Sequence, residues 1–277
     1  MAADPLKSFS LIVRDPEQTL DLARAALAVA QAEYPDLDTE AYVAMLDGLA
    51  RAVERHCTGA SDLYRRLAAM NYVLFQQEGF RGNRSDYYDP RNSYLNEVLE
   101  RKTGIPITLS VLYMEIAKRV GLTLHGVGFP GHFLVKFVAE EGEIVLDPFN
   151  RGEVRSRREL EDLLAGIHRG PVRWRPEFLS AVSKRQILKR MLNNLKGIYL
   201  HRGDLRRGLS VAERLVILEP DSSEELRDRG LLYSRLDCLS QALGDLEAYL
   251  VRAGDAEDVE IIREQVISLR KRVTQVH

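Results

Sequence analysis

The chain has 277 residues, 45% hydrophobic and 29% charged, a composition typical of a folded globular protein and not of a disordered or membrane protein. Its 39 basic and 41 acidic residues give a net charge of −2, so no overall basic field favours nucleic acid as a partner. The two cysteines lie far apart in the sequence, which predicts a protein without a disulfide framework. The sequence also has no long apolar run and no leader-like N-terminus, so we predict a cytoplasmic protein without a membrane span.

Helical periodicity dominates the first part of the chain. Apolar residues recur at helical spacing over 16–55, where Pro35 separates two predicted amphipathic helices. Asp38 or Thr39 is the predicted N-cap of the second of them. A third helix is predicted over 61–77, and a loop rich in Gly, Asn and Asp follows it.

The middle of the chain changes from helical to strand periodicity. A short helix is predicted over 92–101, and a longer one begins at Pro106 and ends before Gly121, because Pro fits the first helical turn and Gly favours a helix end. Three strands are then predicted, over 122–127, 133–138 and 143–146. They indicate a small antiparallel sheet packed on a helix, and polar, arginine-rich sequence follows it to Ile167.

The last part of the chain contains an internal repeat over 188–273. The following pairs are each 34 positions apart: Leu192 and Leu226, Tyr199 and Tyr233, Leu205 and Leu239, Gly208 and Ala242, Leu209 and Leu243, Ile217 and Val251. That period predicts tetratricopeptide-type helix pairs, with a final helix over 259–273. The predicted fold class is α+β, with domains 1–176 (helical N-terminal part and small sheet) and 177–277 (all-α repeat tail).

The stretch between Gly104 and Asn150 resembles the core of a transglutaminase-like (papain-type) domain in the order of helix start, His132 and Asp147. The wider pattern resembles the bacterial SirB-type family, which joins such a domain to a tetratricopeptide-type tail. The motifs that carry this resemblance are GFRGN at 79–83, DYYDP at 86–90, NSYLN at 92–96, GIPI at 104–107, GFPGHF at 128–133 and DPFN at 147–150. The resemblance extends from about Glu17 to the C-terminus and implies the same two-part fold.

The resemblance also implies the positions of a catalytic triad. His132 and Asp147 match the base and the residue that orients it, and we expect them to be in contact, but Pro106 occupies the position of the cysteine nucleophile. A prolyl side chain has no nucleophilic atom. The nearest hydroxyls are those of Thr108 and Ser110, and the pair His132 and Asp147 is interpreted as a relic or as part of a binding site.

The loop before the longer helix carries the candidate binding residues Asn83, Tyr87, Tyr88, Asn92 and Tyr94, which either line a polar, aromatic groove or cover the core. We predict a non-catalytic module that binds a peptide or protein through its cleft and repeat tail, with no metal or cofactor. The alternative is a hydrolase or acyl transferase that uses His132 and Asp147 with Ser110, Thr108 or an activated water.

Overall fold

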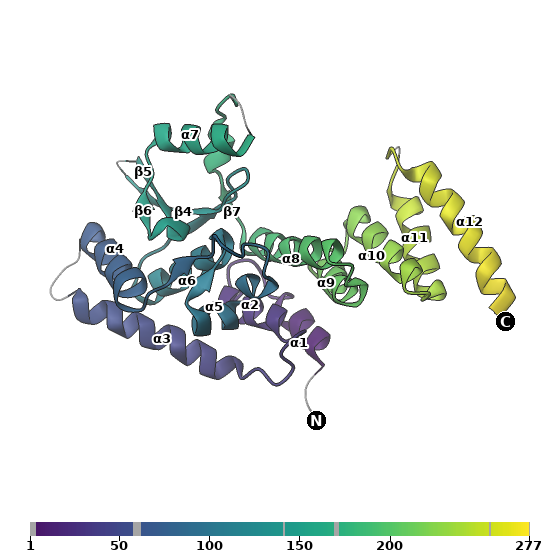
Figure 1. Cartoon of the computed structure of the whole chain (residues 1–277), viewed down its shortest axis with the longest axis horizontal. Coiled ribbons are helices and arrows are strands. Elements are labelled where there is room, and N and C mark those ends of the chain that lie inside the picture. Colours follow the sequence, from purple (N-terminus) through teal and green to yellow (C-terminus); the bar gives the residue numbers. More distant parts are fainter. Residues whose placement is uncertain (1–3, 58–61, 141, 169–171, 255, 277) are drawn as a thin grey trace. The chain divides into compact units, whose positions relative to one another are not determined.

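The computed structural model describes residues 4–57, 62–140, 142–168, 172–254 and 256–276, and the chain forms two compact units (Figure 1). The first unit comprises Met1–Pro5 and Ile12–Met191, and the second comprises Leu6–Leu11 and Leu192–His277. The sequence-based domains 1–176 and 177–277 stay a prediction, because a domain is defined by folding on its own.

The first unit contains most of the helices predicted for the N-terminal part. They are α2 (Leu22–Ala30), α3 (Thr39–His56), α4 (Leu63–Asn71), α5 (Leu95–Arg101) and α6 (Pro106–Arg119). Helix α7 (Arg157–His168), in the arginine-rich stretch after the sheet, was not predicted. The cap predicted for α3 is Asp38, whose carboxylate accepts hydrogen bonds from the backbone N–H groups of Glu40 and Ala41. After α4 the chain widens into a π-helical turn, η1 (Tyr72–Gln77), which helical periodicity did not predict.

A five-stranded antiparallel sheet lies in the same unit, in the order β6-β5-β4-β3-β7. Its strands are β3 (His125–Val127), β4 (Leu134–Ala139), β5 (Gly142–Asp147), β6 (Glu153–Val154) and β7 (Ala181–Val182). The first three are the predicted strands, although β3 begins at His125 and not at 122. The two edge strands were missed because two residues show no periodicity. A separate parallel pair joins β1 (Arg81–Gly82) to β2 (Thr103–Gly104).

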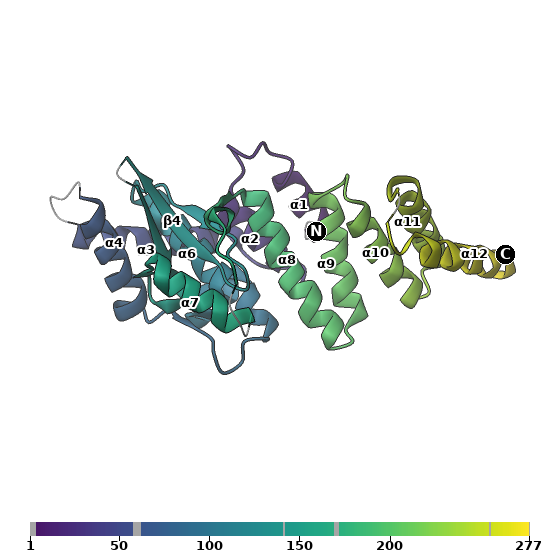
Figure 2. The same ribbon diagram turned by 90° about the horizontal axis from the view of Figure 1, so that it is seen from above.

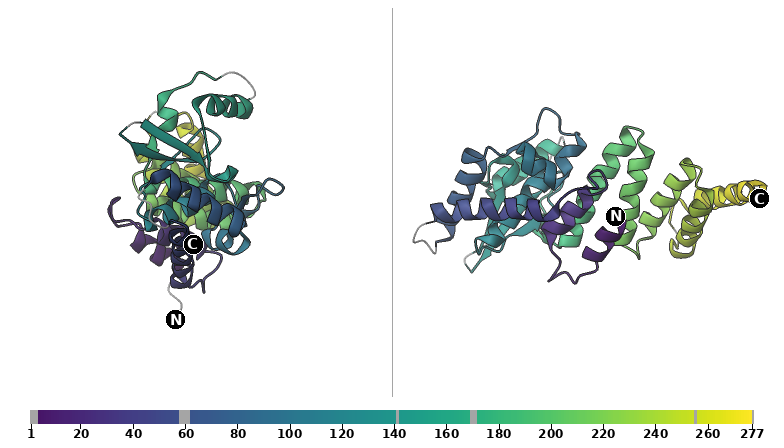
Figure 3. Two further views of the ribbon diagram at one scale, coloured as in Figure 1. Left: turned by 90° about the vertical axis from the view of Figure 1, so that its left-hand side faces the viewer. Right: turned by 90° about the horizontal axis from the view of Figure 1, so that it is seen from below.

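Helices cover both faces of this sheet (Figure 1). Helix α6 packs against β3 and β4, and α2, α3, α4 and α5 surround α6 in turn; α3 is the long helix seen from below in Figure 3 (right). On the other face α7 buries Leu160 and Leu164 against sheet residues such as Val127, Leu134 and Val145. The arginine-rich stretch after the sheet is therefore largely an amphipathic helix, whose two buried leucines are four positions apart.

The second unit consists mainly of the repeat helices. They are the last part of α8 (Lys184–His201), then α9 (Leu205–Leu218), α10 (Ser223–Arg235), α11 (Leu239–Arg252) and α12 (Val259–Val276), with part of α1 (Pro5–Ile12). Helices α9 to α12 pack in succession (Figure 2). The predicted repeat is confirmed, since α9 and α11 begin at Leu205 and Leu239, and the small positions Gly208 and Ala242 are both buried. None of the helices described is long and apolar enough to cross a membrane.

Candidate functional site

The structure brings His132 and Asp147 together at one edge of the sheet. His132 lies just before β4 and Asp147 ends β5, and the Nε2 of His132 lies 3.0 Å from Oδ1 of Asp147. Gly131 adopts a φ of 69°, and Ile167 at the end of α7 packs on the space where a Cβ would stand. Glycine is therefore required for the turn that presents His132.

Asp147 is completely buried and all of its hydrogen bonds favour the carboxylate. Its Oδ2 accepts from Nδ2 of Asn150 at 2.6 Å and from Arg155 at 3.3 Å. Burial alone raises the pKa of Asp147, but the bond and charge of His132, with those of Asn150 and Arg155, outweigh burial and hold that pKa below its usual value. The carboxylate therefore stays ionised and fixes the imidazole, with Nε2 donating.

The other ring nitrogen of His132, Nδ1, has no hydrogen-bond partner among the residues that the structure describes. In the neutral tautomer whose Nε2–H points to Asp147, Nδ1 is the nitrogen that carries the lone pair. His132 is 8% exposed, so the imidazole is almost entirely enclosed by protein. This arrangement is chemically suited to accept a proton from a group next to Nδ1.

Phe149 connects the dyad to the loop after η1. Its ring lies edge-on to His132 at 5.9 Å and to Tyr87 at 6.4 Å, and Arg84 stacks on it at 5.1 Å. The same ring occupies the space where a Cβ on Gly82 would stand, so only glycine allows this approach. Phe149 belongs to the turn η3 (Pro148–Asn150), which packs against α6. The dyad therefore adjoins α6 through one aromatic ring and its turn.

The start of α6 contains no free nucleophile among the predicted candidates. Pro106 is the first helical residue and is buried. The hydroxyl of Thr108 accepts a hydrogen bond from the backbone N–H of Ile105 at 3.1 Å and lies 2.7 Å from the carbonyl oxygen of Asn92, to which it donates. Thr108 therefore caps the helix and anchors the preceding turn.

Ser110 lies one turn further along α6 and is completely buried. Its hydroxyl has no hydrogen-bond partner among the described residues, which leaves an unsatisfied polar group in the interior. The exposed amides of the helix start lie before it, so the helix terminus does not activate Ser110. The structure thus separates two predicted hydroxyls by role, since one is used in a cap and the other is isolated in the core.

The five predicted binding residues fall into two groups. Asn83 and Asn92 are buried and bonded to each other at 3.1 Å, with further bonds to the loop backbone, and Tyr94 is buried edge-on to Tyr34. These three side chains hold the loop in shape. Only Tyr87 and Tyr88 reach the surface, where Tyr88 is 70% exposed and contacts Tyr87 edge-on at 5.3 Å.

Arg190 is a site residue that the sequence did not indicate. From α8 its guanidinium donates to the carbonyl oxygen of His132 at 2.6 Å and stacks on Phe133 at 5.4 Å. Burial lowers the pKa of Arg190 below its ordinary value, although a guanidinium stays protonated at neutral pH. No carboxylate in the described residues pairs with it. Its only sequence signal is a charge inside the apolar stripe of Ile187, Leu188 and Met191, which repeat packing also explains.

The side chains around the dyad are not arranged as metal ligands in the described residues. In the part of the chain that the structure describes, no three or more His, Cys, Asp or Glu side chains gather as metal ligands. The carboxylate of Asp147 is already surrounded by His132, Asn150 and Arg155. The arrangement is that of an oriented imidazole, not of a ligand set.

Comparisons with known proteins cover almost the whole chain. The model of the transglutaminase-like superfamily matches residues 40–193, and a tetratricopeptide-repeat model matches residues 195–266. A UPF0162 protein of Xylella fastidiosa is 39% identical over 265 residues, 94% of each chain, and one of Vibrio cholerae is 31% identical over 90% of this chain and 93% of its own. No solved structure matches.

A shorter match marks the part shared with a eukaryotic protein. Human F-box only protein 21 is 40% identical over 137 residues, which are 47% of this chain and 21% of that protein. The full-length matches confirm the resemblance that the motifs predicted, in both halves of the chain. The chain therefore belongs to the transglutaminase-like superfamily and, within it, to the UPF0162 family, in which the domain is followed by tetratricopeptide repeats.

Proposed function

We propose that this protein is a non-catalytic interaction module, in which a transglutaminase-like domain and a repeat tail bind a peptide or protein partner. Tetratricopeptide repeats generally mediate protein–protein interaction, which supports the part assigned to the tail. The proposed setting is the cytoplasm, in agreement with the two unpaired cysteines, Cys57 and Cys238.

The observation that carries the proposal is the chemistry at the start of α6. Covalent catalysis of the papain type needs a nucleophile there, and the residue present is Pro106. The nearest hydroxyl, that of Thr108, is used in the helix cap. A dyad of His132 and Asp147 without a nucleophile still provides a rigid, polar framework, which suits recognition better than acyl transfer.

The surface that we assign to binding surrounds Tyr87 and Tyr88. Exposed aromatic side chains are enriched at the centres of protein interfaces, because they bury much area at a low cost in conformational entropy. Arg84, stacked on Phe149 and bonded to Asn150, adds a positive charge beside them. Asn83 and Asn92 support this surface from below by holding the loop.

A pull-down from the native cell lysate tests the proposal. Full-length wild-type protein, Tyr88→Ala and Tyr64→Ala are immobilised, and the bound proteins are quantified by mass spectrometry. Tyr64 is the matched control because it is 65% exposed but lies on α4. We expect specific partners with the wild type and Tyr64→Ala, and their loss with Tyr88→Ala. No specific partner for any form would overturn the module, and full retention by Tyr88→Ala would overturn the assigned surface.

A second function, a hydrolase, is favoured by one observation: Nδ1 of His132 has no hydrogen-bond partner among the described residues, so the imidazole is able to act as a general base. Hydrolysis of p-nitrophenyl acetate beyond one equivalent, measured for wild type, His132→Ala and Ser110→Ala, tests it. Turnover that requires His132 but not Ser110 would indicate an activated water, and turnover that requires both would indicate Ser110. Absence of turnover would contradict the hydrolase.

A further inference from the structure

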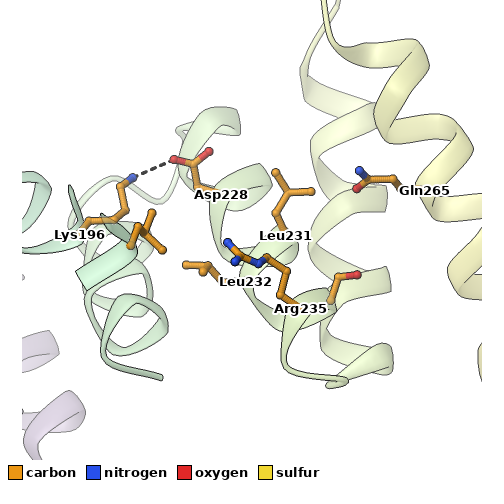
Figure 4. Close-up of a pocket in the computed structure, with 8 residues that line it drawn as sticks. Lys196, Asp228, Leu231, Leu232, Arg235 and Gln265 are labelled. Atoms are coloured by element: carbon orange, nitrogen blue, oxygen red, sulfur yellow. Dashed lines mark hydrogen bonds and ion pairs between the residues drawn. The ribbon is translucent and has the colours of Figure 1, made fainter. Parts of the chain in front are cut away.

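The second unit contains a pocket of about 530 Å³, a size in the range of ligand sites (Figure 4). Its walls come from alternate helices: Lys196 and Leu200 on α8, several residues of α10, and Gln265 on α12. Helices α9 and α11 contribute no lining residue. The pocket therefore lies on the face of the repeat tail that is formed by the first helix of each helix pair, namely α8, α10 and α12.

Helix α10 presents one continuous face to this pocket. Leu231 and Leu232 lie three and four residues after Asp228, and Arg235 lies four and three residues after them, a spacing that places side chains on one side of a helix. Along that face an acidic group, two leucines and a basic group succeed one another. The pocket thus has two polar ends and an apolar middle, which Leu200 extends from α8.

The acidic end is held in fixed ion pairs. Lys196 contacts Glu225 at 3.1 Å and Asp228 at 2.9 Å, and Arg227 contacts Asp228 at 2.9 Å as well as Asp258 at 2.8 Å. Burial lowers the pKa of Lys196, but the two carboxylates outweigh burial and raise that pKa above its usual value. Lys196 therefore stays charged and engaged, and it does not offer its charge to a ligand.

The basic end differs, because Arg235 is exposed and has no ion pair or hydrogen bond among the described residues. Its guanidinium borders the same space as Leu231 and Leu232 (Figure 4). Gln265, from α12, adds an amide that donates hydrogen bonds. A planar guanidinium and an amide donor that line one pocket both suit a carboxylate, which the guanidinium binds with two parallel hydrogen bonds.

We propose that this pocket binds a short segment of a protein partner in which a branched aliphatic side chain lies next to an acidic side chain. The aliphatic group packs on Leu200, Leu231 and Leu232, and the carboxylate pairs with Arg235. This inference rests on the proposed function, because it names the chemistry of the partner at the repeat tail. The charge complementarity of Arg235 selects an acidic segment over a basic one.

Fluorescence anisotropy with defined peptides tests the proposal on the full-length protein. The probe is a fluorescein-labelled peptide in which leucine alternates with glutamate, flanked by glycine and serine. Two comparison peptides replace every glutamate by lysine or every leucine by alanine. We expect saturable binding of the leucine–glutamate peptide and at least about tenfold weaker binding of each comparison peptide, since each lacks one of the two contacts.

Two variants assign the binding to the pocket. Arg235→Glu reverses the charge that receives the carboxylate and should weaken binding at least about tenfold, whereas Arg235→Lys should restore part of it. Arg206→Glu is the matched control, because Arg206 is an exposed arginine on α9, which does not line the pocket. It should leave the affinity within about twofold of the wild type, since a remote surface charge acts only through the screened field. Circular dichroism confirms that each variant is folded.

Several results would overturn the proposal. They are no binding below about 1 mM, equal binding of the lysine peptide, or equal losses from Arg235→Glu and Arg206→Glu. Sedimentation that shows a dimer abolished by Arg235→Glu would assign the pocket to a second copy of the chain. Adding Arg235→Glu to the pull-down above separates the two proposals. Partners that depend on Tyr88 but not on Arg235 would overturn the pocket and support the proposed function, while partners that depend on Arg235 but not on Tyr88 would support the pocket.

Discussion

The dyad and the start of α6 are two regions of the first unit that differ in how their polar groups are satisfied. At the dyad, Asp147 is completely buried, yet three side chains satisfy it and hold its pKa low. At the start of α6, Pro106 supplies no polar side-chain atom and Thr108 uses its hydroxyl for the backbone. The fold holds an oriented imidazole at the sheet edge, whereas Pro106 at the start of α6 carries no nucleophilic atom.

This difference teaches that the hydrogen-bond network around Asp147 has a structural value that does not depend on catalysis. A buried carboxylate that lost its partners would be destabilising, so the network stabilises the fold whether or not the site turns over a substrate. The helix start has no such requirement, because proline and a capping threonine both satisfy the first turn of a helix. Replacing residues on each side of this comparison should therefore have unequal effects.

The largest expected effect comes from Asp147→Ala. It removes the acceptor of His132, Asn150 and Arg155 and leaves Arg155 with only its exposed partners, so the free energy of unfolding should fall by about 3 kcal/mol. Unfolding in guanidinium chloride measures this change in the free energy of unfolding. Glu161→Ala, at an exposed ion pair with Arg157, is the control and should cost less than about 0.5 kcal/mol. Equal costs for the two variants would show that the network is not stabilising.

The pH dependence of stability sharpens the same point. Because the folded state lowers the pKa of Asp147 below its unfolded value of about 3.9, the carboxylate contributes its full stability above that value and loses it as the pH falls through the folded pKa. The difference in unfolding free energy between wild type and Asp147→Asn should therefore be largest near pH 7 and shrink from about pH 5 downward. Unfolding curves between pH 7 and pH 3 measure this. A difference that stays constant would mean that the pKa of Asp147 is not lowered.

The next effect tests whether the start of α6 is the nucleophile position. A thiol in Pro106→Cys would stand at a helix N-terminus near the imidazole, and both favour the thiolate. Its pKa should fall below the value of about 8.5 of a free cysteine, and its reaction with iodoacetamide near pH 6.5 should be about tenfold faster than that of Cys57 or Cys238. Adding His132→Ala should slow the reaction. If the introduced thiol reacts at the rate of an ordinary cysteine, whether or not His132 is present, Pro106 does not occupy the nucleophile position. Ser110 would then be the better candidate.

The smallest effects compare two hydroxyls on one helix. Thr108→Ala removes the cap of α6 and the bond to Asn92, so stability should fall by about 1 kcal/mol, while Thr108→Ser should keep most of it. Ser110→Ala removes a buried hydroxyl without a described partner and should change stability by less than about 0.5 kcal/mol. Thermal unfolding of the three variants measures the order. A larger loss for Ser110→Ala than for Thr108→Ala would show that Ser110 has a bonded role.

Local signals in the sequence were sufficient for much of the fold. The cap at Asp38, the helix from Pro106 and the 34-residue period between α9 and α11 depend on neighbours in the chain or on a simple repeat. The motifs around His132 and Asp147 identified the family for the same reason, because order and spacing are properties of the chain.

Tertiary structure alone decided which polar side chains are used up and which remain at the surface. Asn83, Asn92 and Tyr94 look like binding residues in the sequence, but long-range packing buries them, whereas Tyr88 from the same loop is exposed. Arg190 reaches the carbonyl of His132 across 58 positions, whereas Arg235 has no ion pair or hydrogen bond among the described residues. Such contacts join residues far apart in the chain, leave no periodicity, and are set by packing.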